Sequence, residues 1–369
     1  MRRAACLLVV CAMAGQSAAE PGDLVAADLG WPTDARIAAF KESSRVLAAA
    51  GHGKRVARVA KGTRVTWQRI VPSQDACKAW LELDQPGWAC ASDLVPVTDV
   101  ADAAAKAVAA PPKNAFVGVD LATGAALDFA WAVARVPGAT IAVHDAPDAK
   151  APATAQLSPR DIVAVHEVRG DWARVAGAEL GDAAWVLVGE LRQPLLHARP
   201  AGVADHERWL DVDLDTQILV AYDGDAPTFA TLVSTGRPGD WQTPTGIYRI
   251  RDKDPKARMR YTPPESSGVT ETWDVADVPF VMSFRRNFAL HGAYWHDSFG
   301  RQRSHGCVNL SPPDAKRIYE FVLPNAPDGF ADVEADGDGT PVVIHDRRDP
   351  SPKWLDYDGR PLAAVASSN

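Results

Sequence analysis

The sequence predicts a mainly β protein with one well-marked helix near its end, and three observations support this fold class. Short runs rich in β-branched and aromatic residues recur along the chain, separated by turn residues. The pair Asp223-Gly224 interrupts an alternating polar and apolar run, which is a strong signal for a β-hairpin. Clear helical spacing together with helix-start residues occurs in one segment, 311–324. The length of 369 residues allows two or three domains, each with its own core.

The first residues predict a secretory signal peptide. Two arginines are followed by a short apolar run from Ala4 to about Gly15, and small residues come next. This order predicts removal of residues 1–19 on export, and the apolar run is too short for a permanent membrane span. A disordered tail is the alternative interpretation. We expect an exported protein of the periplasm or cell envelope that does not span the membrane.

The charge of the chain excludes two classes of partner. The formal net charge is −8, and loss of Arg2 and Arg3 with the signal peptide takes it to −10, because residues 1–19 hold no acidic residue. An acidic chain without basic clusters has no electrostatic footprint for nucleic acid. It also lacks the polybasic patch that binds anionic membranes.

Three cysteines remain after the predicted signal peptide. In an oxidising compartment, three cysteines indicate one disulfide and one free thiol. Cys77 and Cys90 are close in sequence and flank a strand-like run, so they form the expected disulfide. A zinc site at these cysteines is the weaker alternative, since a second ligand pair at suitable spacing is missing. Cys307 is left as the free thiol.

The N-terminal half is expected to hold two small β modules. Residues 20–54 form an N-terminal segment with one possible helix over 35–50. Close-spaced strand-like runs over 55–98 predict a small antiparallel barrel. The Ala- and Pro-rich residues 99–114 are interpreted as a linker, and 115–197 are expected to form a second, less regular module.

A weak repeat relates these two modules. Trp88 lies six residues before Leu94, and Trp185 lies six residues before Leu191. This pattern resembles bacterial SH3-like domains, and the resemblance implies that the modules are small barrels able to bind the cell wall. The alternative is that the tryptophans serve only as barrel core.

Further strands and the helix are expected beyond Pro200. Ser311 is a plausible N-cap, Pro312 suits the first helical position, and Asp314 is favourable at the positive end of the helix. Strands are expected at 246–253, 278–284, 288–292 and 340–346.

The run SHGCVN, residues 304–309, carries the candidate chemistry. His305 lies two residues before Cys307, and His291 lies sixteen before it at the end of a predicted strand. A thiol at its usual pKa is little ionised at neutral pH, and a nearby imidazole can accept its proton. Gly306 permits a tight backbone in which the amides of Gly306 and Cys307 point at a developing oxyanion.

Cys307 has two other interpretations. A lone cysteine is commonly a packing residue, but His305, Gly306 and Asn309 are poor neighbours for an apolar slot. A metal ion would need three or four ligands, and no flanking acidic residue has an obvious ligand role. We therefore expect neither a metal nor another cofactor at this thiol.

Together, the HG pair at His291 and the SHGCVN run resemble the signature of the L,D-transpeptidase (YkuD-like) catalytic domain. Ser234-Thr235-Gly236, the run TPTG at 243–246 and the ending DGTPVVIHD are also similar to this family. The resemblance covers 205–347 and leaves 348–369 as a C-terminal tail. It implies a β-sandwich or barrel with one helix after the cysteine loop.

The resemblance also implies a mechanism. Cys307 would attack the bond between the diamino acid and D-alanine of a peptidoglycan tetrapeptide stem, releasing D-alanine and leaving a thioester. An amine of a second stem would resolve it and form a 3→3 cross-link. His291 would be the general base, held through the backbone of Gly292. The amides of His305, Gly306 and Cys307 would form the oxyanion hole.

The remaining site residues are expected to support the loop or contact the substrate. Ser304 and Asn309 would hold the cysteine loop or contact substrate, and Tyr294 would belong to a wall beside the stem. Three alternatives stay open at this point. Water could resolve the thioester, making a carboxypeptidase; a protein amine could resolve it, making an anchoring enzyme; or the chain could be a non-catalytic cell-wall binding protein.

Overall fold

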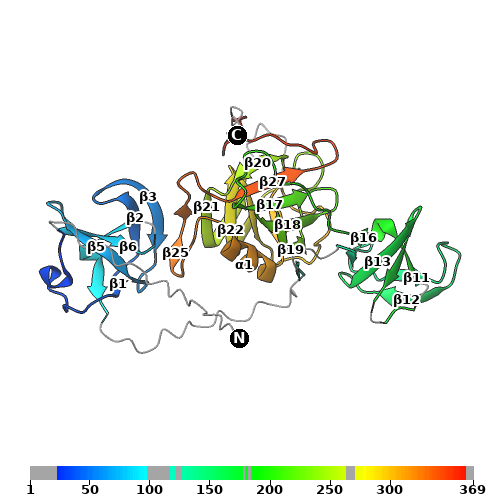
Figure 1. Ribbon diagram of the computed structural model, residues 1–369, viewed down its shortest axis with the longest axis horizontal. Helices are drawn as coiled ribbons and strands as arrows, with labels where there is room; N and C mark the ends of the chain where they lie inside the picture. The colour runs from blue at the N-terminus through cyan, green and yellow to red at the C-terminus, as the bar shows by residue number, and fades with distance from the viewer. Residues whose placement is uncertain are drawn as a thin grey trace, which may run out of the picture. The chain divides into compact units, whose positions relative to one another are not determined.

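The structure is a computed structural model that describes residues 23–85, 87–97, 117–121, 127–177, 179–181, 184–262 and 271–362. The predicted signal peptide and the predicted linker lie outside the described residues. Within these ranges the protein is mainly β, as predicted, with α1 (Pro312–Phe321) as its one α-helix (Figure 1). Every helix in the described ranges falls short of the length and apolar character needed to cross a membrane.

The chain divides into two compact units. The first contains Met1–Ala104 and Pro327–Phe330, and the second contains Ala105–Ala326 and Ala331–Asn369. The elements of the first unit are η1 (Ala26–Leu29), β1 (Ala38–Phe40), β2 (Ser44–Ala49), β3 (His52–Val59), β4 (Arg64–Val65), β5 (Trp67–Pro72), β6 (Ala79–Leu83), β7 (Trp88–Cys90), η2 (Ala91–Asp93) and β8 (Leu94–Pro96).

Two predictions about the first unit are wrong. The helix expected over 35–50 is replaced by β1 and β2, and the module begins well before residue 55, because β1 pairs with β8 and β2 pairs with β3. Phe40 and Val46 are buried on these strands. Strand pairing and burial therefore override the helix propensity of the neighbouring alanines. Cys77 and Cys90 are joined by a disulfide in this unit.

The second unit begins with β9 and a module that repeats the first. Its elements are β9 (Val119–Asp120), β10 (Phe129–Ala132), β11 (Ile141–His144), β12 (Ala153–Leu157), β13 (Ile162–Arg169), β14 (Trp172–Ala176), β15 (Ala184–Leu187), η3 (Val188–Glu190) and β16 (Leu191–Arg192).

The repeat extends to the strand pairing. In the first module β2 pairs with β3 and β7, β6 pairs with β5 and β7, and β1 pairs with β4 and β8. In the second, β11 pairs with β12 and β15, β14 pairs with β13 and β15, and β10 pairs with β13 and β16. Each six-residue step from tryptophan to leucine spans a strand, a 3-10 turn and the next strand. The SH3-like assignment of the modules stays a prediction.

The rest of the second unit contains two further sheets. The strands are β17 (Arg208–Asp213), β18 (Ile218–Asp223), β19 (Ala226–Leu232), β20 (Gly246–Arg249), β21 (Asp252–Tyr261), β22 (Trp273–Arg285), β23 (Phe288–Gly292), β24 (Val308–Leu310), β26 (Val333–Glu334) and β27 (Pro341–His345). The short strand β25 (Phe330–Ala331) pairs with β3 in the sheet of the first unit. One sheet has the order β20-β27-β17-β18-β19-β9 and the other has β24-β23-β22-β21-β26. The hairpin predicted at Asp223-Gly224 is confirmed, whereas the strand predicted over 246–253 is split into β20 and β21.

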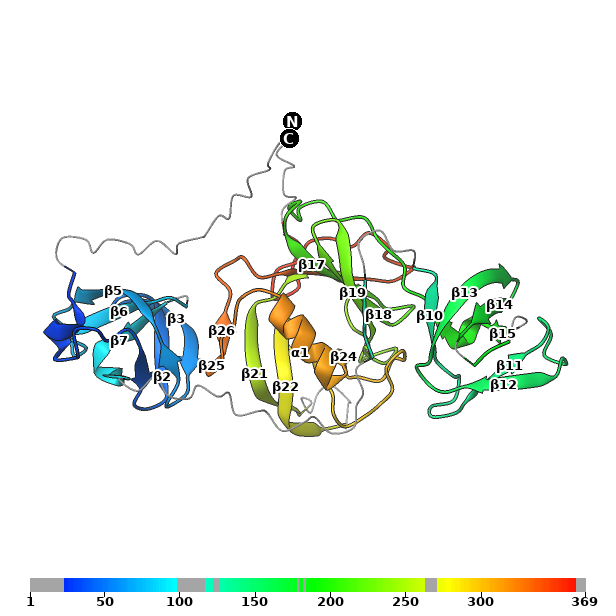
Figure 2. The same ribbon diagram turned by 60° about the horizontal axis from the view of Figure 1, so that its bottom comes forward.

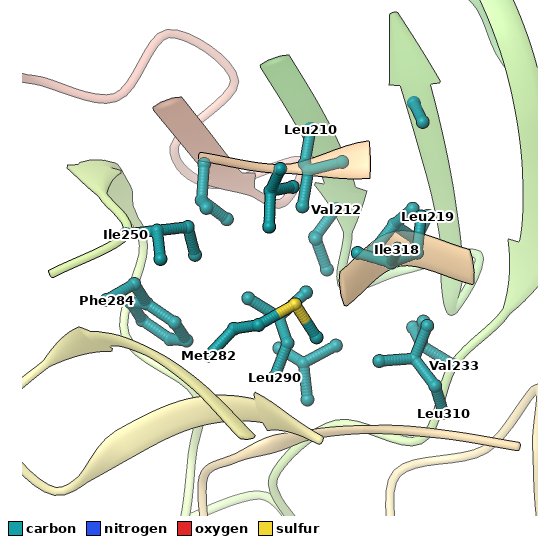
Figure 3. Close-up of a cluster of buried hydrophobic side chains, with 14 of the residues drawn as sticks. Leu210, Val212, Leu219, Val233, Ile250, Met282, Phe284, Leu290, Leu310 and Ile318 are labelled. Carbon is teal, nitrogen blue, oxygen red and sulfur yellow. The ribbon is translucent and has the colours of Figure 1, made fainter. Parts of the chain in front are cut away.

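The main core lies between these sheets and α1. Side chains from β17 and β18 point toward those of β22, β23 and β24, and Ile318 of α1 closes one side (Figure 3). Both views place α1 alongside β22 (Figure 2). The core includes Leu210, Val212, Leu219, Met282, Phe284, Leu290, Val308, Leu310 and Ile318.

A second core covers the opposite face of β17 and β18. Trp209 stacks on Tyr222 with ring centroids 4.0 Å apart. Trp131 of the preceding module packs into the same cluster. Both faces of this sheet are therefore buried, which explains the nearly continuous apolar runs of β17, β18 and β27. The predicted tail does not stay apart, because Lys353 and Leu355 exchange backbone hydrogen bonds with Ile247.

The helix begins and ends as the sequence indicates. Ser311 Oγ accepts from the backbone N–H of Asp314, so the predicted N-cap is confirmed. At the other end, the buried Lys253 on β21 donates from Nζ to the carbonyls of Tyr319 and Val322. A cation at a helix C-terminus satisfies free carbonyls and is favoured by the helix dipole.

Candidate active site

Parallel pairing of β23 and β24 brings the two halves of the motif together. His291 on β23 is opposite Asn309 on β24, and Leu290 is opposite Val308. Cys307 therefore lies immediately before β24, beside the strand that carries His291. The sixteen-residue separation in sequence thus becomes a position on neighbouring strands at one pocket, which is the juxtaposition expected of a nucleophile and its base.

The ring of His291 is held in one orientation. The side chain is 3% exposed, and its Nδ1 lies 3.1 Å from the carbonyl oxygen of Gly292. A carbonyl oxygen only accepts, so Nδ1 carries the proton and Nε2 keeps a lone pair. A side chain at Gly292 would begin 2.9 Å from Pro279 Cγ, so the close approach of the backbone requires glycine here. Trp295 stacks on the other face of the ring at 5.7 Å.

Burial keeps the cysteine and histidine neutral at neutral pH. Burial raises the pKa of the Cys307 thiol to about 11, although the backbone at Ala289 acts in the opposite direction. Burial lowers the pKa of His291 to about 4, although the Gly292 carbonyl opposes the shift. The resting pair is a thiol and a neutral imidazole. Proton transfer must then accompany attack on a substrate rather than precede it.

Ser304 organises the turn that carries the thiol. Its hydroxyl donates to the carbonyl of Cys307 and accepts from the N–H of Gly306, 3.1 Å away. The predicted oxyanion hole therefore needs correction, because the Gly306 amide is already engaged. The amides of His305 and Cys307 are the ones left in this turn to face an oxyanion. Gly306 has φ +116°, and a Cβ there would lie 2.6 Å from Phe288.

The upstream motif segments buttress this turn. Thr243 Oγ1 donates to the Gly306 carbonyl, 2.8 Å away, and accepts from the N–H of Gly236. Ser234 and Asn309 exchange backbone hydrogen bonds of 2.9 and 3.0 Å. The STG and TPTG runs therefore act as a support for the cysteine loop, which gives a physical reason for their presence together.

The side chain of His305 is occupied by partners other than the thiol. Its Nε2 lies 2.7 Å from Glu271, which also accepts from Arg237 at 2.7 Å. Trp241 and Trp273 flank its ring at 4.7 and 5.7 Å. These contacts fix the side chain to a carboxylate and two aromatic rings, so His305 anchors the loop on its outer side.

Asn309 is held by a histidine that the motif does not contain. His296 Nδ1 accepts from the backbone N–H of Ser298, 3.2 Å away, so the ring proton resides on Nε2. The Asn309 side-chain amide lies 2.9 Å from this Nε2. Since amide oxygen and nitrogen are assigned from hydrogen bonding, the carboxamide oxygen is the atom that accepts from His296.

The thiol opens into a pocket of about 660 Å³. His291, Cys307 and Trp295 lie on its wall, and Pro137 of the preceding module also lines it. Tyr294 is not among the lining residues; its hydroxyl donates to the Ala276 carbonyl, and its ring supports Trp295 at 5.0 Å. Three guanidinium groups also line the pocket, those of Arg237, Arg301 and Arg303.

Comparison with known proteins agrees with this geometry. Residues 207–344 match the YkuD family, the L,D-transpeptidase catalytic domain. The chain contains an L,D-transpeptidase catalytic domain. No curated protein sequence matches the chain.

Solved transpeptidase structures are similar to part of the chain. The catalytic domain of the Enterococcus faecium L,D-transpeptidase is 21% identical over 38% of this chain and 98% of its own, with a TM-score of 0.30. L,D-transpeptidase 3 from Mycobacterium tuberculosis is 18% identical over 44% of this chain and 73% of its own, with a TM-score of 0.30. An L,D-transpeptidase from Mycobacterium smegmatis is 19% identical over 47% of this chain and 89% of its own, with a TM-score of 0.30.

Sequence reasoning about the transpeptidase domain missed several pocket residues. Glu271 has no local signal, since it lies 34 residues before its partner His305. Trp295 and His296 lie outside the motif, although Trp295 stacks on His291 and His296 holds Asn309. A histidine between the two motif halves was the available signal for His296. Arg286, which follows β22, pairs with Asp358 and does not line the pocket.

Proposed function

We propose that the protein is an exported cysteine L,D-transpeptidase acting on peptidoglycan stem peptides. The observation that carries the proposal is the fixed, neutral His291 beside the one free cysteine of the described residues, at the wall of an open pocket. The donor is a tetrapeptide stem, and the bond attacked is that between the diamino acid and the terminal D-alanine.

The first half-reaction forms a thioester. Cys307 Sγ bonds to the donor carbonyl carbon while His291 Nε2 takes the thiol proton. The carbonyl oxygen gains negative charge and accepts hydrogen bonds from the amides of His305 and Cys307. When the C–N bond breaks, imidazolium returns the proton to the departing amine of D-alanine. The chain then holds the acyl group on sulfur and a neutral His291.

The second half-reaction regenerates the thiol. An acceptor amine of a second stem attacks the thioester carbonyl and loses a proton to His291 Nε2. Collapse of the intermediate breaks the C–S bond, and the sulfur recovers that proton. The product is a 3→3 cross-linked dimer. Arg301 and Arg303 give the pocket wall a cationic character suited to the carboxylates of an acidic stem, while the charge of Arg237 is paired with Glu271.

Product analysis tests the proposal. The full chain is incubated with disaccharide tetrapeptides and the mixture is followed by mass spectrometry. We expect release of D-alanine and a dimer that joins two stems. Tripeptide without dimer would assign the reaction to a carboxypeptidase, and covalent wall binding of a protein amine would assign it to an anchoring enzyme. Folded protein that releases no D-alanine would refute the donor reaction.

Two histidine variants separate the proposed roles. His291→Gln should lower the acylation rate by about 10²- to 10⁴-fold, because it removes the general base. His305→Gln should cost less than about tenfold, because the hydrogen bonds of Ser304 and Thr243 still hold the cysteine turn. Acylation is followed as the mass increase of the intact chain, with Cys307→Ala as the blank. Equal losses in both variants would contradict the assignment of His291 as the base.

A further inference from the structure

A second cluster of metal-type ligands lies outside the catalytic pocket. His197 Nδ1 is 2.8 Å from one carboxylate oxygen of Asp211, and His345 Nε2 is 3.0 Å from the other. The three ligand atoms all lie within 4.8 Å of one another. They come from three separate segments: the connection between β16 and β17, the middle of β17, and the end of β27.

Two of these polar atoms lack a satisfactory hydrogen bond. Asp211 is 2% exposed and His345 is 7% exposed. Although Asp211 Oδ1 and His345 Nε2 are close, their geometry is not that of a hydrogen bond, and among the described residues neither atom has another hydrogen-bond partner. The two atoms form an ion pair, but a buried carboxylate oxygen and a buried imidazole nitrogen that lack a well-aligned hydrogen bond are still costly. A cation shared between them would satisfy both.

The ligand types specify the class of cation. Two imidazole nitrogens and one carboxylate are the three-ligand set of many zinc sites, in which water or another small ligand takes the fourth position. Ca²⁺ and Mg²⁺ prefer sites made wholly of oxygen atoms.

Space for a fourth ligand is present. The three side chains line a pocket of about 350 Å³ that shares no lining residue with the catalytic pocket. His197 is 40% exposed at its side chain, which leaves a route for an ion to enter.

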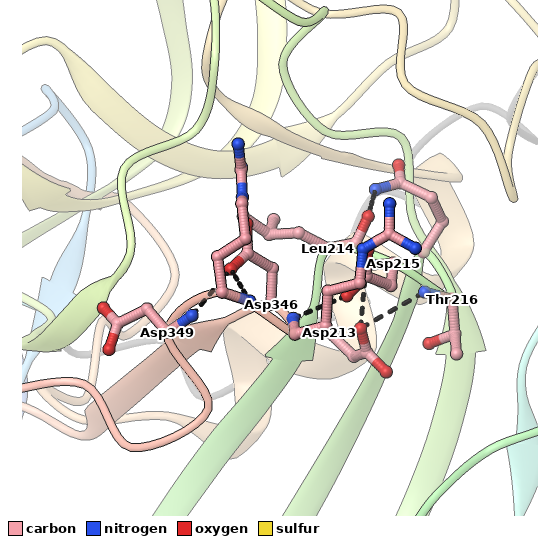
Figure 4. Close-up of polar contacts among 9 residues, drawn as sticks. Asp213, Leu214, Asp215, Thr216, Asp346 and Asp349 are labelled. Atoms are coloured by element: carbon pink, nitrogen blue, oxygen red, sulfur yellow. Dashed lines mark hydrogen bonds and ion pairs between the residues drawn. The ribbon is translucent and has the colours of Figure 1, made fainter.

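The two strands that carry Asp211 and His345 are fixed at their ends. Asp213 Oδ1 accepts from the N–H groups of Asp215 and Thr216, which closes the turn after β17 (Figure 4). Asp346 Oδ1 accepts from the N–H groups of Arg348 and Asp349, directly after His345. Preorganised ligands favour metal affinity because little conformational entropy is lost on binding.

We propose that His197, Asp211 and His345 form a Zn²⁺ site that ties the segment before β17 to the middle of β17 and the end of β27. The site is separate from the chemistry at Cys307, and its role is structural or regulatory.

Zinc binding by the full chain tests this site. Cys307→Ala protein is used throughout, because a thiol near histidine can itself hold zinc. After equilibration with zinc sulfate and gel filtration, we expect one equivalent of bound zinc. Co²⁺ in its place should give the intense visible absorption of a four-coordinate site.

Substitution of the proposed ligands in the Cys307→Ala parent identifies the residues that bind zinc. His197→Ala and His345→Ala should each weaken zinc affinity by at least about 100-fold, since even outer-shell changes cost 10- to 100-fold. The matched control is His206→Ala. This variant removes an exposed histidine that pairs with Asp205 at 2.9 Å but belongs to no three-ligand cluster among the described residues. Its zinc content should equal that of the parent.

The overturning results are equally specific. Absence of bound zinc in the folded Cys307→Ala parent, or unchanged zinc in His197→Ala, would reduce the cluster to an ion pair only. His197 is a partly exposed side chain on a connecting segment, so this variant decides the matter if His345→Ala fails to fold.

Discussion

At the scale of single residues, the site depends on which nitrogen of His291 carries the proton. The Gly292 carbonyl fixes it on Nδ1 and leaves Nε2 as the acceptor. Burial then depresses the pKa of His291 and raises that of Cys307. A thiolate–imidazolium pair is therefore disfavoured before a substrate binds, and the reactive sulfur is generated only as the bond to the substrate forms.

This protonation state predicts an unusually flat pH profile. His291 loses its ability to act as a base only near its pKa of about 4, and the thiol ionises only near its pKa of about 11. The single-turnover rate of Cys307 acylation by a carbapenem should thus vary less than about threefold between about pH 5.5 and 8.5. Stopped-flow absorbance and intact mass give the rate. A midpoint near pH 6.5, the ordinary value for histidine, would contradict a buried, neutral base.

The sequence predicted the reacting residues better than their surroundings. Cys307, His291 and Ser304 belong to a spaced motif, so their proximity could be inferred without coordinates. The contact of His305 with Glu271 and that of Asn309 with His296 depend on tertiary packing. The engagement of the Gly306 amide by Ser304 is a matter of turn geometry, which residue identities alone do not determine.

At the scale of elements, the start of α1 was predictable because residues next to it in sequence determine it. The end of α1 depends on a residue far away in sequence. The capping residues at Ser311 and Pro312 are adjacent in sequence to the helix. The helix end is held by Lys253, a residue of β21 that is far away in the chain. The same distinction explains the error over 35–50, where alanine-rich local propensity indicated a helix but pairing with β3 and β8 produced strands.

Removal of the Lys253 cap should destabilise the unit that carries the site. Lys253→Ala leaves two helix carbonyls without a donor and opens a cavity, so we expect a loss of about 2–4 kcal/mol in the free energy of unfolding. Urea unfolding followed by fluorescence measures the loss. The matched control is Lys256→Ala on the same strand, whose exposed ion pair with Asp277 should change stability by less than about 0.5 kcal/mol.

The pH dependence of that loss has a definite sign. Burial lowers the pKa of Lys253 from 10.5 to about 8. Between these values the unfolded chain binds a proton that the folded chain does not, so stability from this group rises with pH across the interval. This contribution to stability is fully present above the pKa of Lys253 in the unfolded chain, 10.5. It is lost as the pH falls through the pKa in the folded chain, about 8. The difference between wild type and Lys253→Ala should therefore be larger at pH 10 than at pH 7.

At the scale of the whole molecule, the two repeated modules have different relations to the catalytic domain. The first belongs to one compact unit, while the second shares a unit with the transpeptidase domain. Trp131 of the second module packs in the core that contains Trp209, Tyr222 and Val343. Its Nε1 also donates to the Val117 carbonyl. The second module therefore completes the buried face of the sheet whose other face forms the main core.

A pair of matched tryptophan variants tests this difference. Trp131→Ala should destabilise the unit that contains Cys307 by about 3–5 kcal/mol, because a fully buried indole is lost from a core shared with the transpeptidase domain. Trp80→Ala removes a similarly buried indole from the first unit and should leave the unfolding of the Cys307 unit unchanged. Pulse proteolysis in urea, with detection of the carbapenem-labelled fragment, follows that unit alone. If Trp131→Ala and Trp80→Ala left the labelled fragment equally resistant, the second module would be an independent attachment. If both variants weakened it equally, the two compact units would have to unfold together.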